Sequence, residues 1–326
     1  MLQFFYFTVL LLAIFNTGAR AAQAPVKLLS DGNKIPIIAL GTAGSKEDVA
    51  RMRQAVYWAI EAGYRHIDTA ELYGNEVEVG QGIADAIKNG LVMREELFVT
   101  TKLWNNHHNR DIVIPALQDS LKRLGLDYVD LYLIHTPIAQ KSDGQYEDID
   151  YLETWRGMEA AQKLGLTKSI GVSNFNSEQL GRILSNCEIK PVVNEIEVNP
   201  TLTQVPLVSY CRSVGVEVMS YSPFGFMVSR NKLDTPPPKF DDPDLVKIAQ
   251  KYGKSTSQIV LRYLIDRGTI PIPKSTNKER IKKNIDIFDF QLNEDEVATI
   301  NKFNKNQRVI EFDDWKNHPN YPFHKP

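Results

Sequence analysis

The chain has 326 residues, of which 43% are hydrophobic and 24% are charged, and its formal net charge is −2. This composition is typical of a folded globular protein and excludes a wholly disordered chain. The near-zero charge argues against a nucleic-acid-binding function. The two cysteines, Cys187 and Cys211, cannot form a disulfide scaffold or a four-ligand zinc site, and we expect no metal centre.

Residues 1–21 are predicted to be a secretory signal peptide. Residues 2–15 are almost entirely apolar, and the segment ends in Ala19-Arg20-Ala21, the small-residue pattern of a cleavage site. One alternative is an uncleaved anchor, but the apolar run is shorter than the roughly 20 residues that span a bilayer; another is a spurious extension. We therefore expect a secreted protein, free of membranes after cleavage, with one folded domain over residues 22–326; a cytoplasmic or ER-associated location is the alternative.

The remaining chain alternates predicted strands and helices. A hairpin around Gly32 is predicted over residues 27–37. Strand candidates follow at residues 38–40, 66–68, 98–102, 129–134, 169–172, 192–196, 217–221 and 270–273. Helical patterns occur at residues 47–61, 76–88, 111–124, 151–164, 177–184, 206–214, 255–267 and 278–288. This α/β pattern predicts a (β/α)8 TIM barrel with an N-terminal β-hairpin and a C-terminal substrate loop. A doubly wound open sheet is the alternative, although it usually has fewer units.

Gly80 and Gly82 resemble part of the dinucleotide-binding turn of a Rossmann fold. Asp85 stands where a third glycine is required, and its carboxylate would repel a pyrophosphate. Val77, Gly80 and Ile83 fit one face of a helix better. We therefore predict a helix here and no Rossmann site.

Four titratable residues lie at or just after the ends of three consecutive predicted strands. Asp68 and Tyr73 follow the second strand, Lys102 the third and His135 the fourth. Taken singly, each has the alternative explanation of a helix cap or a solvated side chain. Because the active site of a barrel lies at the carboxyl ends of its strands, the four together indicate a catalytic group.

The chemistry of these four residues suits proton delivery to a carbonyl oxygen. Tyrosine ordinarily has a pKa of ~10, too high for an efficient acid at neutral pH, and a nearby ammonium group lowers that pKa. We therefore predict that Lys102 lowers the pKa of Tyr73, with Asp68 as the counter-ion of Lys102. His135 would donate a hydrogen bond to the carbonyl oxygen. Reduction also requires a hydride, which a cofactor must supply.

Several segments resemble the signatures of the aldo-keto reductase superfamily: residues 63–76, 101–104, 131–135, 171–175, 221–223 and 272–276. The resemblance extends from residue 26 to residue 326 and is greatest to insect reductases of 3-dehydroecdysone. It implies that Tyr73 is the general acid and that Asp68, Lys102 and His135 complete a tetrad. It also implies NADPH bound across the barrel mouth without a Rossmann fold.

The same resemblance implies a cofactor site. Its residues would be Thr42, Asp68, Ser173, Asn174, Glu195, Tyr221, Ser222, Lys274, Ser275, Thr276, Arg280 and Asn284. Ser173 and Asn174 would bind the nicotinamide carboxamide, and Tyr221 would stack on its ring. Lys274, Ser275 and Arg280 would hold the 2′-phosphate, and Asn284 would face the adenine; the alternative for residues 274–284 is a basic, solvated helix start. Glu195 replaces the usual glutamine, and a carboxylate accepts hydrogen bonds but does not donate them.

The predicted substrate-binding residues are Tyr73, Trp104, His135 and Phe224. The pocket walls are expected to include Ala43, Thr136, residues 224–227, Trp315, Tyr321 and Phe323. These walls are mostly apolar and fit a small-molecule carbonyl that is bulky and hydrophobic, such as a 3-ketosteroid, better than a phosphorylated sugar. Thr136 stands where many family members carry an aromatic residue and is expected to widen the pocket.

Other functions stay open at this stage. A general aldehyde or xenobiotic carbonyl reductase would have the same tetrad. Some relatives with this barrel are channel-associated subunits or lens proteins, so a non-catalytic NADPH-binding barrel is a further alternative, against which the intact tetrad argues. Reduction of an enone double bond usually goes with glutamate in place of His135. We expect a monomer.

Overall fold

The computed structural model describes residues 23–228 and 235–323. The predicted signal peptide, residues 1–21, lies outside these ranges. Within them, no helix is both long enough and apolar enough to cross a membrane.

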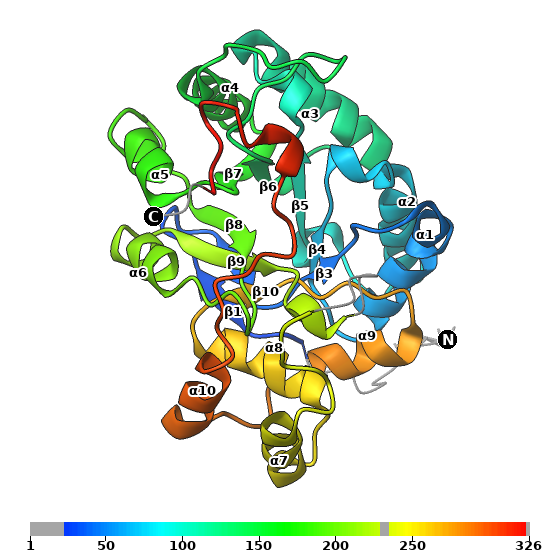
Figure 1. Ribbon diagram of the computed structural model, residues 1–326. Helices are drawn as coiled ribbons and strands as arrows, with labels where there is room; N and C mark the ends of the chain where they lie inside the picture. Colours follow the sequence, from blue (N-terminus) through cyan, green and yellow to red (C-terminus); the bar gives the residue numbers. More distant parts are fainter. Residues whose placement is uncertain (1–22, 229–234, 324–326) are drawn as a thin grey trace, which may run out of the picture.

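Eight parallel strands form a curled sheet at the centre of the molecule (Figure 1). They are β3 (Leu40–Gly41), β4 (His66–Asp68), β5 (Phe98–Leu103), β6 (Val129–Ile134), β7 (Thr167–Ser173), β8 (Val193–Glu197), β9 (Glu217–Tyr221) and β10 (Ile270–Pro271). The backbone amide of Ala39 donates to the oxygen of Pro271, and that of Gly41 to Pro273, both at 3.1 Å. These bonds join β10 to β3, so the sheet is closed and the predicted (β/α)8 barrel is confirmed.

Helices surround the barrel (Figure 1). Those at the predicted places are α1 (Lys46–Glu61), α2 (Glu76–Lys88), α3 (Arg110–Leu124), α4 (Tyr151–Lys163), α5 (Ser177–Leu184), α6 (Val205–Ser213), α8 (Thr256–Asp266) and α9 (Lys278–Ile285). The prediction missed α7 (Pro243–Tyr252) and α10 (Glu294–Asn301), which pack against α8. Signals for α7 were present, since Asp242 caps its first turn, Pro243 occupies the first helical position and Gly253 ends it.

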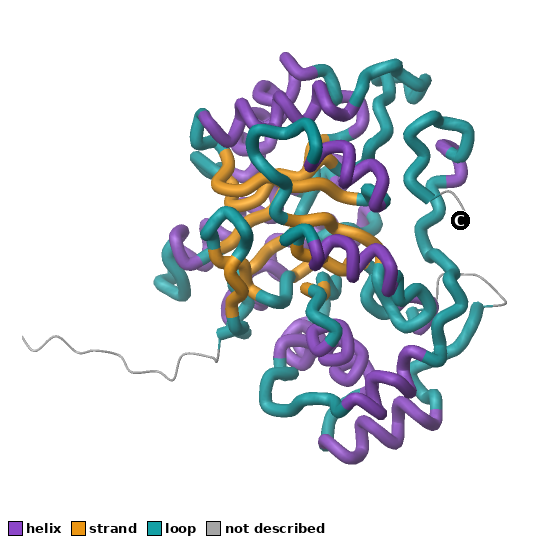
Figure 2. Tube along the Cα trace, turned by 90° about the vertical axis from the view of Figure 1, so that its left-hand side faces the viewer, coloured by secondary structure: helices purple, strands orange, loops and turns teal. Residues whose placement is uncertain are grey.

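The N-terminal hairpin covers the end of the barrel opposite the C-terminal segment (Figure 2). It consists of β1 (Val26–Leu28) and β2 (Lys34–Pro36), paired antiparallel as predicted. Asn33 donates to the hydroxyl of Ser169 near the start of β7 at 3.0 Å. Leu29 and Ile35 belong to the apolar cluster inside the barrel, together with Leu131, Leu133, Val193, Met219 and Ile270. The hairpin therefore closes the amino-terminal end of the barrel with apolar side chains.

The two glycines of the rejected Rossmann motif lie in helix α2, as the sequence predicts. A Cβ atom on Gly80 would overlap the backbone oxygen of Leu124 in α3, and one on Gly82 would lie 2.5 Å from the oxygen of Arg53 in α1. These glycines allow α2 to pack closely between its two neighbours.

Candidate active site

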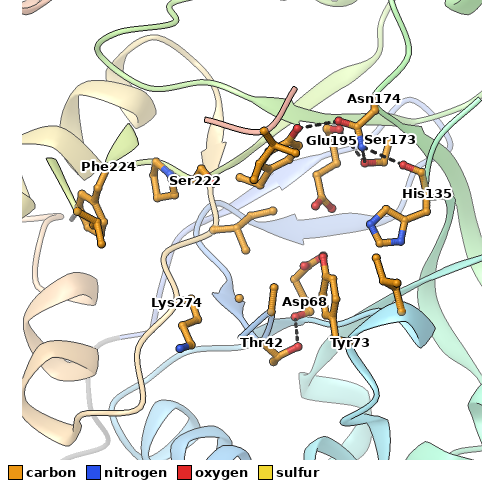
Figure 3. Close-up of a pocket in the computed structure, with 18 of the residues that line it drawn as sticks. Thr42, Asp68, Tyr73, His135, Ser173, Asn174, Glu195, Ser222, Phe224 and Lys274 are labelled. Atoms are coloured by element: carbon orange, nitrogen blue, oxygen red, sulfur yellow. Dashed lines mark hydrogen bonds between the residues drawn. The ribbon is translucent and has the colours of Figure 1, made fainter. Parts of the chain in front are cut away.

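A cavity of about 500 Å³ lies at the carboxyl ends of the strands (Figure 3). Asp68 is the last residue of β4, Tyr73 ends the short 3-10 helix η1 (Glu71–Tyr73), and His135 directly follows β6. All three line the cavity. Lys102, in β5, is fully buried beside Asp68 and Tyr73. The structure therefore brings together the four residues that the sequence assigns to catalysis.

Lys102 is held by a dense set of acceptors. Its ammonium donates to both oxygens of Asp68 at 2.7 and 2.8 Å and to the backbone oxygen of Thr69 at 3.1 Å. The hydroxyl of Tyr73 lies 3.5 Å away. Burial opposes the charge of Lys102, but the nearby carboxylates of Asp68 and Glu195 outweigh it and raise the pKa of Lys102 above its ordinary value. Lys102 is therefore a cation, with Asp68 as the predicted counter-ion.

The pKa of Tyr73 differs from the sequence-based expectation. Burial raises this pKa above the ordinary value of tyrosine, and the carboxylates of Asp68 and Glu195 raise it further. Lys102 lowers it, as predicted, but does not outweigh the other effects. The phenol is therefore fully protonated and acts as a hydrogen-bond donor whose proton moves only when an acceptor becomes strongly basic.

His135 is a neutral imidazole next to Tyr73. Burial, with a smaller contribution from the charge of Lys102, lowers the pKa of His135 well below its ordinary value. Its ring lies edge-on to the rings of Tyr73 and Trp104, with centroid separations of 5.8 and 5.1 Å. The Nδ1 atom of His135 has no hydrogen-bond partner among the described residues. A neutral ring can donate one N–H to a substrate oxygen without carrying a charge.

Glu195, in β8, points into the same cavity (Figure 3). Its Oε1 atom lies 3.3 Å from the ammonium of Lys102, and its Oε2 atom has no partner among the described residues. Burial and the nearby Asp68 raise the pKa of Glu195 well above its ordinary value, although the charge of Lys102 opposes this shift. A protonated carboxyl group can donate as well as accept, as a glutamine amide does. The shift moves Glu195 toward this donating form, whereas the sequence-based expectation considered only the acceptor carboxylate.

Polar side chains beside Glu195 form a connected set. The amide of Asn174 donates to the hydroxyl of Ser173 at 3.0 Å and to the backbone oxygen of His135 at 2.9 Å. The hydroxyl of Tyr221 donates to Oδ1 of Asn174 at 2.8 Å. The predicted cofactor residues that line the cavity are Thr42, Asp68, Ser173, Asn174, Glu195, Tyr221, Ser222 and Lys274.

The remaining predicted cofactor residues lie beyond Lys274. Ser275 is buried, and its hydroxyl accepts from Nε of the exposed Arg280 at 3.4 Å. Thr276 lies on the same loop, and Asn284 is buried one helical turn after Arg280 on α9. Sequence reasoning missed Asp48, which forms an ion pair with Lys274. The two residues are 226 positions apart, so no local pattern signals this contact.

The cavity wall is partly different from the predicted one. Ala43 and Phe224 line it as predicted, and the sequence analysis missed Leu72, Val228, Ile310 and Phe312. Thr136 is fully buried, its hydroxyl donates to Asn105 at 2.7 Å, and it is not among the residues that line the cavity, contrary to the prediction. Trp104, Trp315, Tyr321 and Phe323 do not line the cavity themselves. Trp104 contacts His135, whereas Phe312 packs against Trp315 and Phe323 and is held in the wall by them.

The tail that carries Ile310 and Phe312 is attached to the end of β8. The buried carboxylate of Glu197 accepts from the backbone amides of Val309 at 2.8 Å and Ile310 at 3.0 Å. The hydroxyl of Tyr146 also donates to the backbone oxygen of Asp314 at 2.8 Å. These few bonds position the apolar wall over the strand ends.

The arrangement matches one family of proteins. The family model described as "Aldo/keto reductase family" matches residues 38–305. Aldo-keto reductase AKR2E4 of Bombyx mori is 66% identical over 93% of this chain and 99% of its own length. Its crystal structure in complex with NADP has a TM-score of 0.92 and covers 93% of this chain and 100% of that chain at 65% identity.

Two further proteins are similar over most of the chain. The crystal structure of aldo-keto reductase AKR2E5 complexed with NADPH has a TM-score of 0.91 and 47% identity, and covers 93% of this chain and 94% of that chain. Estradiol 17 beta-dehydrogenase 5 of Mus musculus is 41% identical over 90% of this chain and 96% of its own length. With the sequence motifs, the closed barrel and the strand-end tetrad in agreement, the chain belongs to the aldo/keto reductase family.

Proposed function

We propose that the protein uses NADPH to reduce a bulky hydrophobic aldehyde or ketone, such as the 3-ketosteroid 3-dehydroecdysone, to an alcohol. The observation that carries this proposal is one continuous cavity, with Tyr73 and His135 in one part and Lys274 in another (Figure 3). A proton donor and a cation for a cofactor phosphate are therefore accessible from the same space.

The residues present fit NADPH. Next to the tetrad, the unpartnered oxygen of Glu195 and the amide of Asn174 are suited to a carboxamide. Farther along, Lys274 and Arg280 with the hydroxyls of Ser275 and Thr276 suit a phosphate. The related structures with TM-scores of 0.92 and 0.91 are complexes with NADP and NADPH, which supports the same assignment here. When bound, NADPH supplies the hydride for carbonyl reduction.

The tetrad would bind and protonate the carbonyl oxygen of the substrate. His135 donates an N–H to the carbonyl oxygen and fixes its position beside Tyr73. As negative charge develops on that oxygen, the phenol proton of Tyr73 moves to it. The adjacent ammonium of Lys102 stabilises the resulting phenolate, and Asp68 holds Lys102 in place through two hydrogen bonds.

The wall chemistry supports the substrate class. Leu72, Phe224, Val228, Ile310 and Phe312 present apolar surface to the cavity. Apolar surface of this kind favours binding of a large hydrophobic skeleton and leaves the polar tetrad to orient its carbonyl group. One relative is named for estradiol, a steroid, which agrees with this substrate class.

Steady-state reduction rates on a substrate panel test the proposal. We expect kcat/KM for 3-dehydroecdysone to exceed that for the small polar glyceraldehyde by at least about tenfold, because only the former buries a hydrophobic skeleton against the wall. A smaller hydrophobic aldehyde without the steroid skeleton is the control that separates the effect of substrate size from that of hydrophobicity. If kcat/KM is higher for all simple aldehydes than for 3-dehydroecdysone, the protein is better described as a general aldehyde reductase. If NADPH is oxidised with none of the substrates, a non-catalytic barrel is supported.

We further propose that the protein is secreted after cleavage near Ala21. The apolar run at residues 2–15 and the pattern Ala19-Arg20-Ala21 support this proposal. Expression of the full coding sequence in insect cells should give a product in the medium that begins near Ala22, as determined by N-terminal sequencing. A product that retains Met1 and stays in the cytosol would contradict secretion and leave the enzymatic proposal unaffected.

A further inference from the structure

Asp48 occupies the phosphate end of the proposed cofactor site. It lies in the first turn of α1, which packs against α9 (Figure 1). One of its carboxylate oxygens forms a short ion pair with the ammonium of Lys274. The other accepts a hydrogen bond from the hydroxyl of Thr276 at 3.3 Å. Both oxygens are thus bound to side chains that the proposed function assigns to a cofactor phosphate.

The local sequence fixes this carboxylate in position. Ser45 caps α1, and its backbone amide donates to Asp48 at 3.1 Å, as in a capping box. A Cβ atom on Gly44 would lie 2.7 Å from the carboxylate, so the preceding turn leaves space for Asp48 only because residue 44 is glycine. Burial raises the pKa of Asp48, but the hydrogen bonds from Lys274 and Ser45 outweigh this and lower it overall. Asp48 is therefore an anion at neutral pH.

The ion pair is partly open to solvent. The side chain of Lys274 is 31% exposed and that of Asp48 is 22% exposed, so an incoming phosphate can reach the ammonium. The neighbouring cation Lys278 pairs instead with Glu61 at 2.8 Å, and Arg280 contacts Ser275. Lys274 is therefore the cation whose charge Asp48 neutralises before any phosphate arrives.

We propose that Asp48 is an internal counter-ion at the 2′-phosphate site, which the cofactor must displace from Lys274 and which thereby limits the preference for NADPH over NADH. This inference rests on the proposed function. The phosphate is a dianion that competes with Asp48 for one ammonium and is repelled by the remaining carboxylate. NADH has an uncharged 2′-hydroxyl at this position, so it neither competes with Asp48 for the ammonium of Lys274 nor is repelled by the carboxylate.

The variant Asp48→Asn tests the inference. Asparagine keeps the shape of the side chain and an oxygen that can accept from Ser45, but it removes the charge. We expect the Kd of NADPH to fall by about tenfold, as estimated for a unit charge a few ångströms from the phosphate in a partly solvated site. The Kd of NADH should change by less than about twofold. Both constants can be measured by quenching of protein fluorescence.

The matched control is Glu47→Gln, which removes the same charge from the same helical turn. Glu47 is exposed and forms no ion pair among the described residues. It should change both constants by less than about twofold, since an exposed and more distant charge is screened. The thermal unfolding midpoints of both variants should be measured alongside to verify that each is folded.

A second probe, 2′,5′-ADP, isolates the phosphate end and should show the same tightening as NADPH in Asp48→Asn. Equal Kd values for NADPH in Asp48→Asn and Glu47→Gln would overturn the inference and leave the proposed function intact. A loss of NADPH affinity in Asp48→Asn would also overturn it. If the wild-type protein bound neither NADPH nor 2′,5′-ADP, the proposed function would fail, and the inference with it.

Discussion

Replacement of Tyr73 by phenylalanine should lower kcat for carbonyl reduction by about 10²- to 10⁴-fold, the usual contribution of general acid catalysis, because the variant retains no proton to transfer. The Tyr73 hydroxyl lies 3.5 Å from Lys102 and faces the cavity, so its loss leaves the apolar walls and the phosphate end unchanged. The Kd of NADPH should therefore stay within about twofold of the wild-type value. Single-turnover rates and fluorescence titrations measure the two quantities separately.

Tyr64→Phe is a matched control for this experiment. Tyr64 is fully buried, its hydroxyl has no hydrogen-bond partner among the described residues, and it does not line the cavity. It should retain wild-type kcat within about twofold, since it removes a buried hydroxyl that touches no reacting group. More than a few per cent of wild-type kcat in Tyr73→Phe would show that another group donates the proton.

Replacement of Lys102 by methionine should destabilise the folded protein by about 3–5 kcal/mol, the usual cost of leaving one partner of a buried ion pair uncompensated. The buried carboxylate of Asp68 would lose two hydrogen bonds from the ammonium. The same variant should lose most of its kcat, because the phenolate of Tyr73 would lack its stabilising charge. Urea unfolding at neutral pH measures the first effect.

The stability deficit of Lys102→Met should depend on pH in a defined direction. Burial already raises the pKa of Asp68, and Lys102 is the main group that lowers it. Without Lys102 the folded protein holds the proton on Asp68 above the unfolded pKa of roughly 3.9. The deficit should therefore be small near pH ~4 and grow as the pH rises toward ~7.

The double variant Asp68→Asn/Lys102→Met separates stability from catalysis. It removes both charges, so its free energy of unfolding should recover to within about 1–2 kcal/mol of the wild type, while kcat stays low. Recovery of kcat together with stability would show that Lys102 acts only through the fold.

Local sequence patterns were sufficient to predict the barrel and the place of the tetrad. Asp68, Lys102 and His135 each stand at the end of an apolar run, and parallel strands bring such ends to one edge. The sequence order of the predicted strands is therefore enough to place these three residues at the active-site face of the barrel. In a closed barrel the carboxyl ends of all strands lie on one face, so residues at those ends come close together.

The properties that depend on contacts across the barrel could not be predicted. The pKa of Tyr73 is raised in part by Glu195, which reaches it from β8, four strands away from β4 in the sheet. The pairing of Lys274 with Asp48 depends on how α1 packs against α9. The buried hydroxyl of Thr136 bonds to Asn105, which lies in the short 3-10 helix after β5. None of these contacts has a signature within a window of neighbouring residues.

The attachment of the C-terminal tail through Glu197 has an evolutionary consequence. The tetrad side chains stand at or near strand ends, whereas Ile310 and Phe312 belong to a tail in which the amides of Val309 and Ile310 bond to the carboxylate of Glu197. These bonds involve the backbone and not the side chain of Ile310, so this wall position can be exchanged for other residues that keep the amide at little cost to the barrel. Descendants of this protein can therefore acquire new substrates by drift in the tail while the reduction chemistry stays unchanged.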